Sequence, residues 1–239
     1  MNKTVIVTGG AKRIGKAICK TFHDKGFDII CHYNSSNEEA EALGKELNNL
    51  REDSCKLIKF DLNETNNYKN FTDKLISLSN SIDVLINNAS AFYATSLGES
   101  KEADWEALHN SNLRGPYLIS ELLKENLIKS SGNIINITDA MVIRGMKNYT
   151  IYSTAKGGLE TLTKSLAKEL APKVRVNGVA PGAILLPSDG SSNEELLLSQ
   201  IPLGRLGTEQ DIASAAFHLC QNTYITGQIL RVDGGRSLS

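Results

Sequence analysis

A tyrosine and a lysine stand four residues apart in the stretch Tyr152-Ser-Thr-Ala-Lys156, and Asp139 precedes the tyrosine by thirteen positions. Residues i and i+4 share one face of a helix, so the Tyr152 phenol and the Lys156 ammonium can line one pocket. A cation beside a phenol favours the phenolate, and we expect it to lower the pKa of Tyr152 from about 10 toward neutrality. Such a phenol donates a proton to a carbonyl or imine under reduction. The same spacing is common on solvated helices, so the rest of the sequence must decide.

The composition excludes several other classes of protein. The chain has 239 residues, 41% hydrophobic and 22% charged, with a net charge of −1, which does not indicate a surface for nucleic acid. The four cysteines are scattered and lack histidine partners, so we expect no metal site, no disulfide framework and a reducing compartment. We find no apolar run of about 18 residues and no signal peptide, and we therefore expect a cytoplasmic protein without membrane contact.

Short β-branched runs alternate with amphipathic stretches along the chain. The predicted strands are Thr4–Val7, Phe27–His32, Cys55–Phe60, Asp83–Asn87, Asn133–Ile137, Val174–Val179 and Gln228–Val232. The predicted helices are Arg13–Lys25, Asn37–Asn49, Asn67–Ser79, Asp104–Ile128 with a break or kink near Gly115-Pro116, Thr150–Leu170 and Glu209–Cys220. This alternation predicts one α/β domain over residues 1–239, a doubly wound parallel sheet flanked by helices. The irregular stretch Ala183–Glu194 is a candidate substrate lid.

A glycine-rich turn joins the first predicted strand to the first helix. Its sequence is Thr8-Gly9-Gly10-Ala11-Lys12-Arg13-Ile14-Gly15. Glycine lets a pyrophosphate approach the backbone closely, and the amides of the helix N-terminus supply donors. Its position at the first β–α junction is the context that a dinucleotide site requires.

The end of the second strand indicates which dinucleotide is bound. An NAD site expects an acid there, whereas this chain has Cys31-His32-Tyr33-Asn34-Ser35-Ser36, with no acid before Glu38. Lys12 and Arg13 add positive charge nearby, so we expect NADPH. Histidine is only partly charged near neutrality, and we expect His32 to contribute a hydrogen bond or stacking rather than an ion pair.

The chain resembles the short-chain dehydrogenases/reductases along almost its full length. The resemblance is carried by motifs in the family's order and spacing: the Thr-Gly-x3-Arg-x-Gly turn, Asp61-Leu62, Asn87-Asn88-Ala89, Asn112, Tyr152-x3-Lys156, Pro181-Gly182 and Asp233-Gly234-Gly235. It implies a Rossmann-type fold and a homotetramer in which the helices Asp104–Ile128 and Thr150–Leu170 pair around two-fold axes.

Several departures from the family pattern resemble the pteridine reductases. The family's usual glycine in the turn is Arg13, its catalytic serine is Asp139, and the familiar Asn-Asn-Ala-Gly continues here as Ser90-Ala-Phe92. This resemblance implies reduction of a dihydropterin such as dihydromonapterin or dihydrobiopterin, and of dihydrofolate, with Phe92 stacked on the pterin. The substrate-binding residues would be Arg13, Ser90, Phe92, Asp139 and Tyr152. Arg144 and Lys147 are further candidates for contact with an anionic substrate tail.

The family resemblance also implies a role for each motif. Lys156 would bind the nicotinamide ribose and lower the pKa of Tyr152, Tyr152 and Asp139 would supply the proton, and Asn112 would hold a water that links Lys156 to solvent. The catalytic residues would thus be Asp139, Tyr152, Lys156 and Asn112. The cofactor-binding residues would be Gly9, Lys12, Arg13, Ile14, Gly15, His32, Tyr33, Asn34, Ser35, Asp61, Leu62, Asn88, Ala89, Ser90, Tyr152, Lys156, Pro181 and Gly182.

Two other functions remain open at this stage. One is a reductase of 3-oxoacyl thioesters or other carbonyls, against which Asp139 argues, because an ionised carboxylate opposes negative charge that develops on a carbonyl oxygen. The other is a dinucleotide sensor without chemistry, which has no need of Tyr152 and Lys156. Structural roles also remain open, with Asp139 as a helix cap, Phe92 as a packing residue and Arg13 as a solvated residue.

Overall fold

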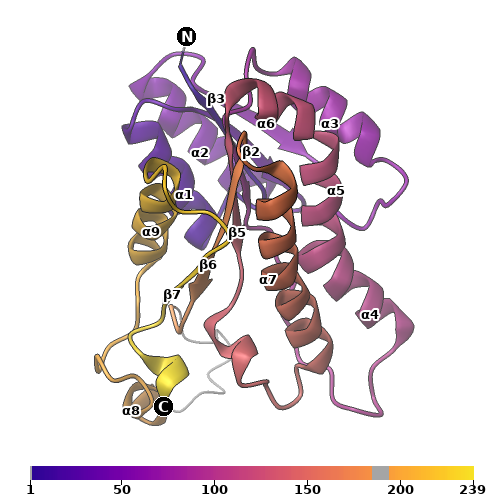
Figure 1. Ribbon diagram of the computed structural model, residues 1–239, viewed down its shortest axis with the longest axis vertical. Helices are drawn as coiled ribbons and strands as arrows, with labels where there is room; N and C mark the ends of the chain where they lie inside the picture. Colours follow the sequence, from indigo (N-terminus) through magenta and orange to yellow (C-terminus); the bar gives the residue numbers. More distant parts are fainter. Residues whose placement is uncertain (1, 185–193) are drawn as a thin grey trace.

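The computed structural model describes residues 2–184 and 194–239, and its centre is a sheet of seven parallel strands (Figure 1). The strands are β1 (Thr4–Val7), β2 (Asp28–Tyr33), β3 (Cys55–Lys59), β4 (Val84–Asn87), β5 (Asn133–Ile137), β6 (Arg175–Pro181) and β7 (Ile229–Val232). Their order is β3-β2-β1-β4-β5-β6-β7. The chain therefore reverses its direction across the sheet between β1 and β4, and ligands of such sheets bind outside the carboxyl ends of the strands near that reversal.

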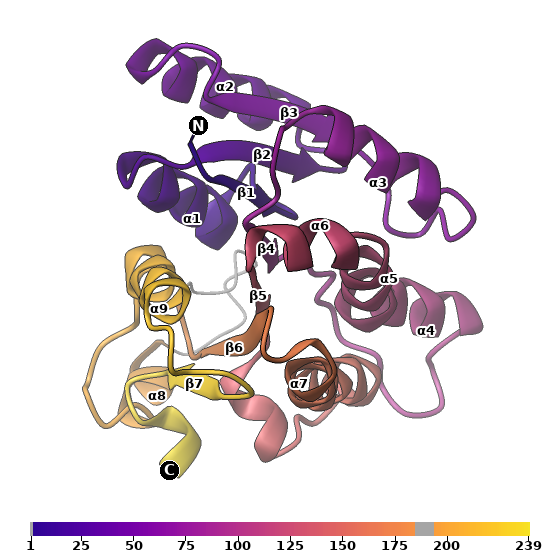
Figure 2. The same ribbon diagram turned by 45° about the horizontal axis from the view of Figure 1, so that its top comes forward.

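Helices cover both faces of the sheet. They are α1 (Arg13–Asp24), α2 (Asn37–Leu50), α3 (Tyr68–Ser77), α4 (Glu102–His109), α5 (Gly115–Leu122), α6 (Lys124–Ser130), α7 (Thr150–Leu170), α8 (Glu194–Ser199) and α9 (Glu209–Gln221). Figure 2 shows α1 and α9 on one side of the sheet, with α5 and α7 on the other. The predicted fold class, a single α/β domain of Rossmann type, is confirmed.

The strands divide the core into two layers because side chains alternate between the faces of a strand. In β1, Val5 and Val7 pack in the layer beneath α1 and α9, whereas Ile6 packs with residues of α3, α5 and α7. All three side chains are fully buried. Near-continuous apolar strands of this kind are typical of a parallel sheet covered on both faces.

The predicted helix Asp104–Ile128 is three helices and a π-helical turn in the structure. The π-turn Asn110–Arg114 follows α4, and the Gly115 amide donates to the Asn110 carbonyl five residues back. Pro116 has no amide hydrogen and stands at the start of α5, where its missing donor does not matter. A second break at Leu123 separates α5 from α6. The expected kink near Gly115-Pro116 thus lies at the end of a π-turn that periodicity alone did not reveal.

Three short elements escaped the sequence prediction: two 3-10 turns, Ala140–Ile143 and Arg236–Leu238, and α8. Most of the predicted lid, residues 185–193, lies outside the described residues. Along the described ranges, no helix combines the length and the apolar character that a membrane crossing requires.

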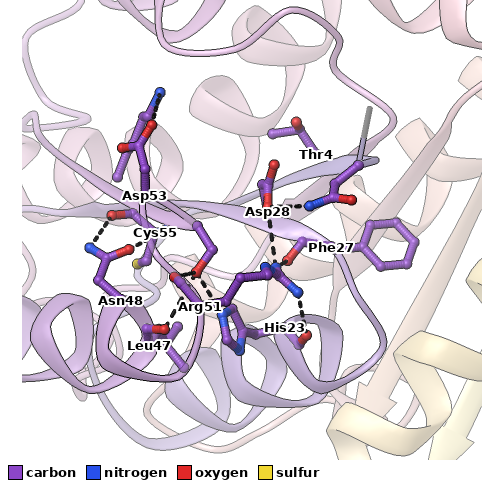
Figure 3. Close-up of polar contacts among 12 residues, drawn as sticks. Thr4, His23, Phe27, Asp28, Leu47, Asn48, Arg51, Asp53 and Cys55 are labelled. Atoms are coloured by element: carbon purple, nitrogen blue, oxygen red, sulfur yellow. Dashed lines mark hydrogen bonds and ion pairs between the residues drawn. The ribbon is translucent and has the colours of Figure 1, made fainter.

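A polar network fastens the edge of the sheet where β2 and β3 begin (Figure 3). The Arg51 guanidinium donates to the carbonyls of His23 and Phe27 and pairs with Asp28 at 3.2 Å. One ring nitrogen of His23 lies 2.7 Å from the Ser54 hydroxyl. The network lies at the amino ends of these strands and stabilises the loops there. It therefore does not occupy the carboxyl ends of the strands, where ligands of such sheets bind.

Two leucines of α2 offer a matched test of the core. Leu47 is fully buried, whereas Leu50, three residues later, is 68% exposed. We expect Leu47→Ala to lower the free energy of unfolding by about 2–5 kcal/mol, because it removes buried methyl groups and leaves a cavity. Leu50→Ala should change it by less than about 0.5 kcal/mol. Urea unfolding of both variants measures the difference, and equal losses would contradict the assigned face of α2.

Candidate active site

One cavity of about 750 Å³ opens at the carboxyl ends of five strands. Gly9 follows β1, Tyr33 ends β2, Asn88 follows β4, Asp139 follows β5 and Pro181 ends β6, and all five residues line it. The volume is within the range of about 300–1,000 Å³ that small-molecule sites show. The predicted cofactor-binding and substrate-binding residues all line this cavity, whereas Asn112 and the two further candidates, Arg144 and Lys147, are not among its lining residues.

The glycine turn packs so closely that side chains are excluded from two positions. A Cβ on Gly9 would lie 2.9 Å from the Ala89 Cα, and one on Gly15 would lie 2.1 Å from the Gly9 carbonyl oxygen. Arg13 stands where the family usually has glycine, and it adopts the left-handed conformation with a φ of 49°. That conformation costs a non-glycine residue about 1–2 kcal/mol. The turn thus keeps the backbone shape that a glycine would adopt, although Arg13 replaces it.

The N-terminus of α1 faces the cavity with bare amides. Its N-cap residue, Lys12, makes no side-chain cap, so donors of the first turn remain open to an anion. The Lys12 ammonium instead lies 2.6 Å from Glu39, whereas Arg13 forms no ion pair with any residue that the structure describes. A bare glycine turn, open amides and a nearby cation fit the pyrophosphate and ribose of a nicotinamide dinucleotide.

His32 is a fully buried neutral imidazole that holds the turn. Its Nδ1 accepts the Gly9 amide at 3.2 Å, and its Nε2 lies 3.0 Å from the Phe60 carbonyl oxygen. Burial lowers the pKa of His32 to about 4. Its ring therefore carries no charge near neutrality, in line with the expected hydrogen bond, and it acts on the shape of the turn.

Asp139 and Tyr152 meet at the other half of the cavity. Asp139 Oδ2 accepts the Tyr152 hydroxyl at 3.0 Å, while Oδ1 accepts the Met141 amide at 2.8 Å and caps the 3-10 turn Ala140–Ile143. Asp139 is thus a helix cap through one oxygen and contacts Tyr152 through the other, and its catalytic role stays a prediction.

This contact reverses the expected effect on Tyr152. The phenol is 4% exposed, and burial together with the Asp139 carboxylate raises its pKa well above the ordinary value, although a hydrogen bond from Ser90 lowers it. The prediction that Lys156 lowers the pKa of Tyr152 is wrong, because burial and the adjacent carboxylate raise it. Burial likewise raises the pKa of Asp139, against the effects of Met141, Tyr152 and Lys156. Tyr152 therefore keeps its proton.

Lys156 lies one helical turn beyond Tyr152, as predicted, and is 2% exposed. Its ammonium donates to the Ile137 carbonyl at 2.7 Å and lies 6.0 Å from the centre of the Tyr152 ring. Burial lowers the pKa of Lys156 to about 8, and Asp139 partly offsets that effect. The cation thus faces the cavity without bonding to the phenol.

Asn112 lies in the π-turn, and its side chain is bonded within the protein. Its amide nitrogen donates to the carbonyls of Ala91 and Leu108, both at 2.9 Å, and its oxygen accepts the Ser90 hydroxyl at 2.7 Å. These partners use both amide hydrogens and one of the two acceptor sites of the oxygen, so a water held by Asn112 stays a prediction. Through Ser90 it instead positions a hydroxyl beside Tyr152.

Aromatic and apolar side chains form the wall next to Tyr152. The Phe92 ring stacks on Tyr149 at 4.7 Å with 9° between the planes and meets Tyr152 edge-on at 4.8 Å. Tyr149 thus covers one face of the Phe92 ring, and the side chain is still 57% exposed, so a stacking role for Phe92 stays a prediction. The cavity also has lining residues that were not predicted from the sequence, among them Met141, Met146, Leu197 and Arg236. Only Met141, close to Asp139 in sequence, carried a local signal.

Comparisons with known proteins agree on the kind of protein. Residues 9–237 match a family described as enoyl-(acyl carrier protein) reductase. A 3-oxoacyl-(acyl-carrier-protein) reductase FabG of Thermotoga maritima is 36% identical, covering 98% of this chain and 97% of that protein. Proteins of the same name from Staphylococcus aureus and Chlamydia trachomatis are each 34% identical over 98% of this chain and 98% and 97% of their own lengths.

These relatives overturn the expected function. The prediction of a pteridine reductase is wrong, because the full-length relatives carry the name of the activity that stood as its alternative. The departures at Arg13, Ser90, Phe92 and Asp139 remain facts of this chain, and they require another explanation.

The neutral state of His32 gives a test of the site. Its folded pKa of about 4 lies below the unfolded value of about 6.5. The unfolded state therefore binds the proton first, and the free energy of unfolding should fall by up to about 3 kcal/mol as pH falls from 6.5 to 4. Urea unfolding of the wild type and of His32→Gln isolates this contribution, which the variant should lack. An imidazole resonance of His32 that titrates near pH 6.5 would contradict the assignment.

Proposed function

Since the chain belongs to the short-chain dehydrogenase/reductase family, we propose that it is an NADPH-dependent oxidoreductase that reduces the 3-oxo group of an acyl thioester carried by acyl carrier protein. The observation that carries the proposal is the full-length similarity to three proteins of that name. The protonated Tyr152 in the cavity supports it, because ketone reduction requires a proton donor at the oxygen.

The choice of NADPH follows from the charges around the second strand. Tyr33, Asn34, Ser35 and Ser36 line the cavity at the end of β2, and none of them is an acid that would repel a 2′-phosphate. Arg13 supplies the nearby cation, since Glu39 neutralises Lys12. Asp61 and Leu62 would flank the adenine, Asn88 and Ala89 the adenosine ribose, and Pro181 and Gly182 the nicotinamide; these residues line the cavity.

Tyr152 is the acid of the proposed reaction. When bound, the reduced nicotinamide supplies the hydride to the 3-oxo carbon. As the carbonyl oxygen becomes an alkoxide, Tyr152 gives it a proton. Because its pKa is raised, Tyr152 stays protonated until so strong a base appears. The Lys156 ammonium stabilises the negative charge that passes through the phenol oxygen.

Asp139 takes part as a neutral carboxyl group. An ionised carboxylate would oppose the alkoxide, whereas a protonated one passes its proton to Tyr152 while Tyr152 passes its own to the substrate. Burial raises the pKa of Asp139 and so favours this form. After the transfer, Asp139 is a carboxylate, Tyr152 is again a phenol, and solvent returns one proton before the next turnover.

The remaining site residues would position the substrate. The Ser90 hydroxyl beside Tyr152 and the exposed side of Phe92 would contact the 3-oxoacyl group. The alternative of a silent dinucleotide sensor has less support, since it leaves the buried Lys156 and the Asp139–Tyr152 contact without purpose. From the family resemblance we further propose a homotetramer in the cytoplasm, its interfaces on faces of α4–α6 and α7 that do not cover the sheet; light scattering after size exclusion measures the assembly.

Turnover measures the proposed function directly. We expect NADPH oxidation when purified protein meets a 3-oxoacyl thioester, with a lower kcat/KM for NADH. Tyr152→Phe should lower kcat at least ~100-fold, the low end of general-acid contributions, while NADPH titrated by fluorescence still binds. A panel of dihydropterins and dihydrofolate runs beside the thioester. Reduction of pterins without reduction of the thioester would refute the proposal, and tight NADPH binding with no turnover at all would favour the sensor.

The pH profile tests the neutral form of Asp139. The raised pKa of Asp139 places its deprotonation above the ordinary value near 3.9, so kcat/KM should fall as pH rises through it. Asp139→Ser supplies the hydroxyl usual in the family and removes this fall in kcat/KM. The variant should then lose activity only as Lys156 loses its charge, at a pH below about 8, because it lacks the Asp139 charge that raises the pKa of Lys156. Measurement of thioester reduction from pH 5 to 9 compares the two proteins, and superimposable profiles would remove Asp139 from the proton path.

A further inference from the structure

An arginine at the C-terminal end of the chain lines the substrate half of the cavity. Arg236 begins the 3-10 turn Arg236–Leu238, which packs against the 3-10 turn that Asp139 caps. It lines the cavity together with Asp139, Met141, Met146 and Leu197. In Figure 1 the chain terminus, in yellow, lies at the same end of the molecule as α8 and the start of α7.

The guanidinium of Arg236 lacks the carboxylate partner that two other arginines of the C-terminal region have. Arg205 pairs with Asp211 at 3.2 Å and Arg231 with Glu160 at 3.6 Å, but among residues 2–184 and 194–239 Arg236 forms no ion pair. Its Nη2 lies 3.4 Å from the Gln200 side-chain oxygen. Its Nε is buried and has no hydrogen-bond partner. A buried donor without a partner costs stability unless a ligand completes it.

Two carboxylates of the described residues act on Arg236, and both are already bonded to other groups. Asp233 accepts the amides of Gly235 and Ser237 at 2.9 and 2.8 Å. Asp139 accepts the Met141 amide and the Tyr152 hydroxyl. Both attract Arg236 only at longer range, and Arg144, at the end of the adjacent turn, adds a second positive charge that opposes it. Because these carboxylates bond to other groups, the Arg236 guanidinium keeps donors that an incoming anion can use.

We propose that Arg236 selects the substrate by binding an oxyanion, a carboxylate or a phosphate, carried on the same molecule as the carbonyl under reduction. A planar guanidinium binds both groups through two parallel hydrogen bonds. The inference rests on the proposed function and adds to it the charge of the substrate. On a thioester, the oxyanion has two sources: a carboxylate at the end of the acyl chain, or the phosphate of a 4′-phosphopantetheine arm.

A set of paired thioesters distinguishes these sources. The first pair is 3-oxohexanoyl and 3-oxoadipoyl N-acetylcysteamine, equal in chain length but differing by a terminal carboxylate. The second pair is 3-oxohexanoyl pantetheine and 3-oxohexanoyl 4′-phosphopantetheine, which differ by the phosphate. We expect the wild type to prefer the anionic member of one pair at least ~10-fold in kcat/KM, mostly through a lower KM. This preference corresponds to the lower end of the free energy that a hydrogen bond to a charged group contributes. The pair that shows the preference identifies the source.

Variants of Arg236 assign the preference. Arg236→Gln should abolish the preference for the anionic substrate. Arg236→Lys should keep part of this preference, because lysine has the charge but cannot form the two parallel hydrogen bonds of a guanidinium. Arg114→Gln is the matched control: Arg114 is exposed, lies outside the cavity lining, and its variant should keep the full preference. Equal kcat/KM within both pairs, or a preference that survives Arg236→Gln, would overturn the inference.

A binding measurement separates this inference from the proposed function. If no thioester is reduced, the proposed function fails, and calorimetric titration of 4′-phosphopantetheine and of adipate into NADP⁺-saturated protein still tests Arg236. Binding of one probe that Arg236→Gln weakens at least ~10-fold supports the site. Absence of binding, or equal binding by both proteins, refutes it.

Discussion

The hydrogen bond from the Tyr152 hydroxyl to Asp139, 3.0 Å long, is the contact on which the chemistry proposed for this protein depends. It joins the end of a central strand to the first turn of the longest described helix, and the burial of both partners raises both pKa values. In the family pattern a serine stands in place of Asp139, and it cannot carry a charge. Here the same position holds a group whose protonation state decides whether it assists or opposes an alkoxide.

The sheet makes this contact possible and sets the rest of the site around it. The reversal of strand order between β1 and β4 brings the glycine turn and the segment after β4 together. The imidazole of His32 fixes the turn by accepting the Gly9 amide, and the Asn112 side chain fixes Ser90 beside Tyr152. Each of these residues acts by holding a donor or an acceptor at the cavity. The parallel sheet therefore places the glycine turn on one side of the cavity and Tyr152 on the other, as the proposed function requires.

Much of this could be predicted from the sequence, and the failures have physical causes. The helix Thr150–Leu170 was predicted to the residue, because its apolar stripe packs on the sheet along its full length. The π-turn Asn110–Arg114 was not, since one extra residue in a turn leaves the hydrophobic period nearly unchanged. The pKa of Tyr152 was predicted in the wrong direction because spacing reveals the lysine and hides the depth of burial.

The substrate was predicted wrongly from residues that do line the site. Phe92 and Asp139 suggested a flat, polar ring, but the stacking partner of Phe92 is Tyr149, and the neutral form of Asp139 also suits a ketone. Substitutions in a site indicate local chemistry, whereas the relatives match the entire chain. Arg236 was missed because only the fold brings the last residues of the chain to the cavity.

The central claim is that Tyr152 is held as a protonated acid rather than as a phenolate. Ultraviolet difference absorbance between the wild type and Tyr152→Phe, followed as pH rises from 6, reports the ionisation of this one phenol. The account predicts no tyrosinate signal from Tyr152 up to pH ~10, the ordinary value for a tyrosine, because burial and Asp139 raise its pKa. A tyrosinate signal that appears near neutral pH would contradict it.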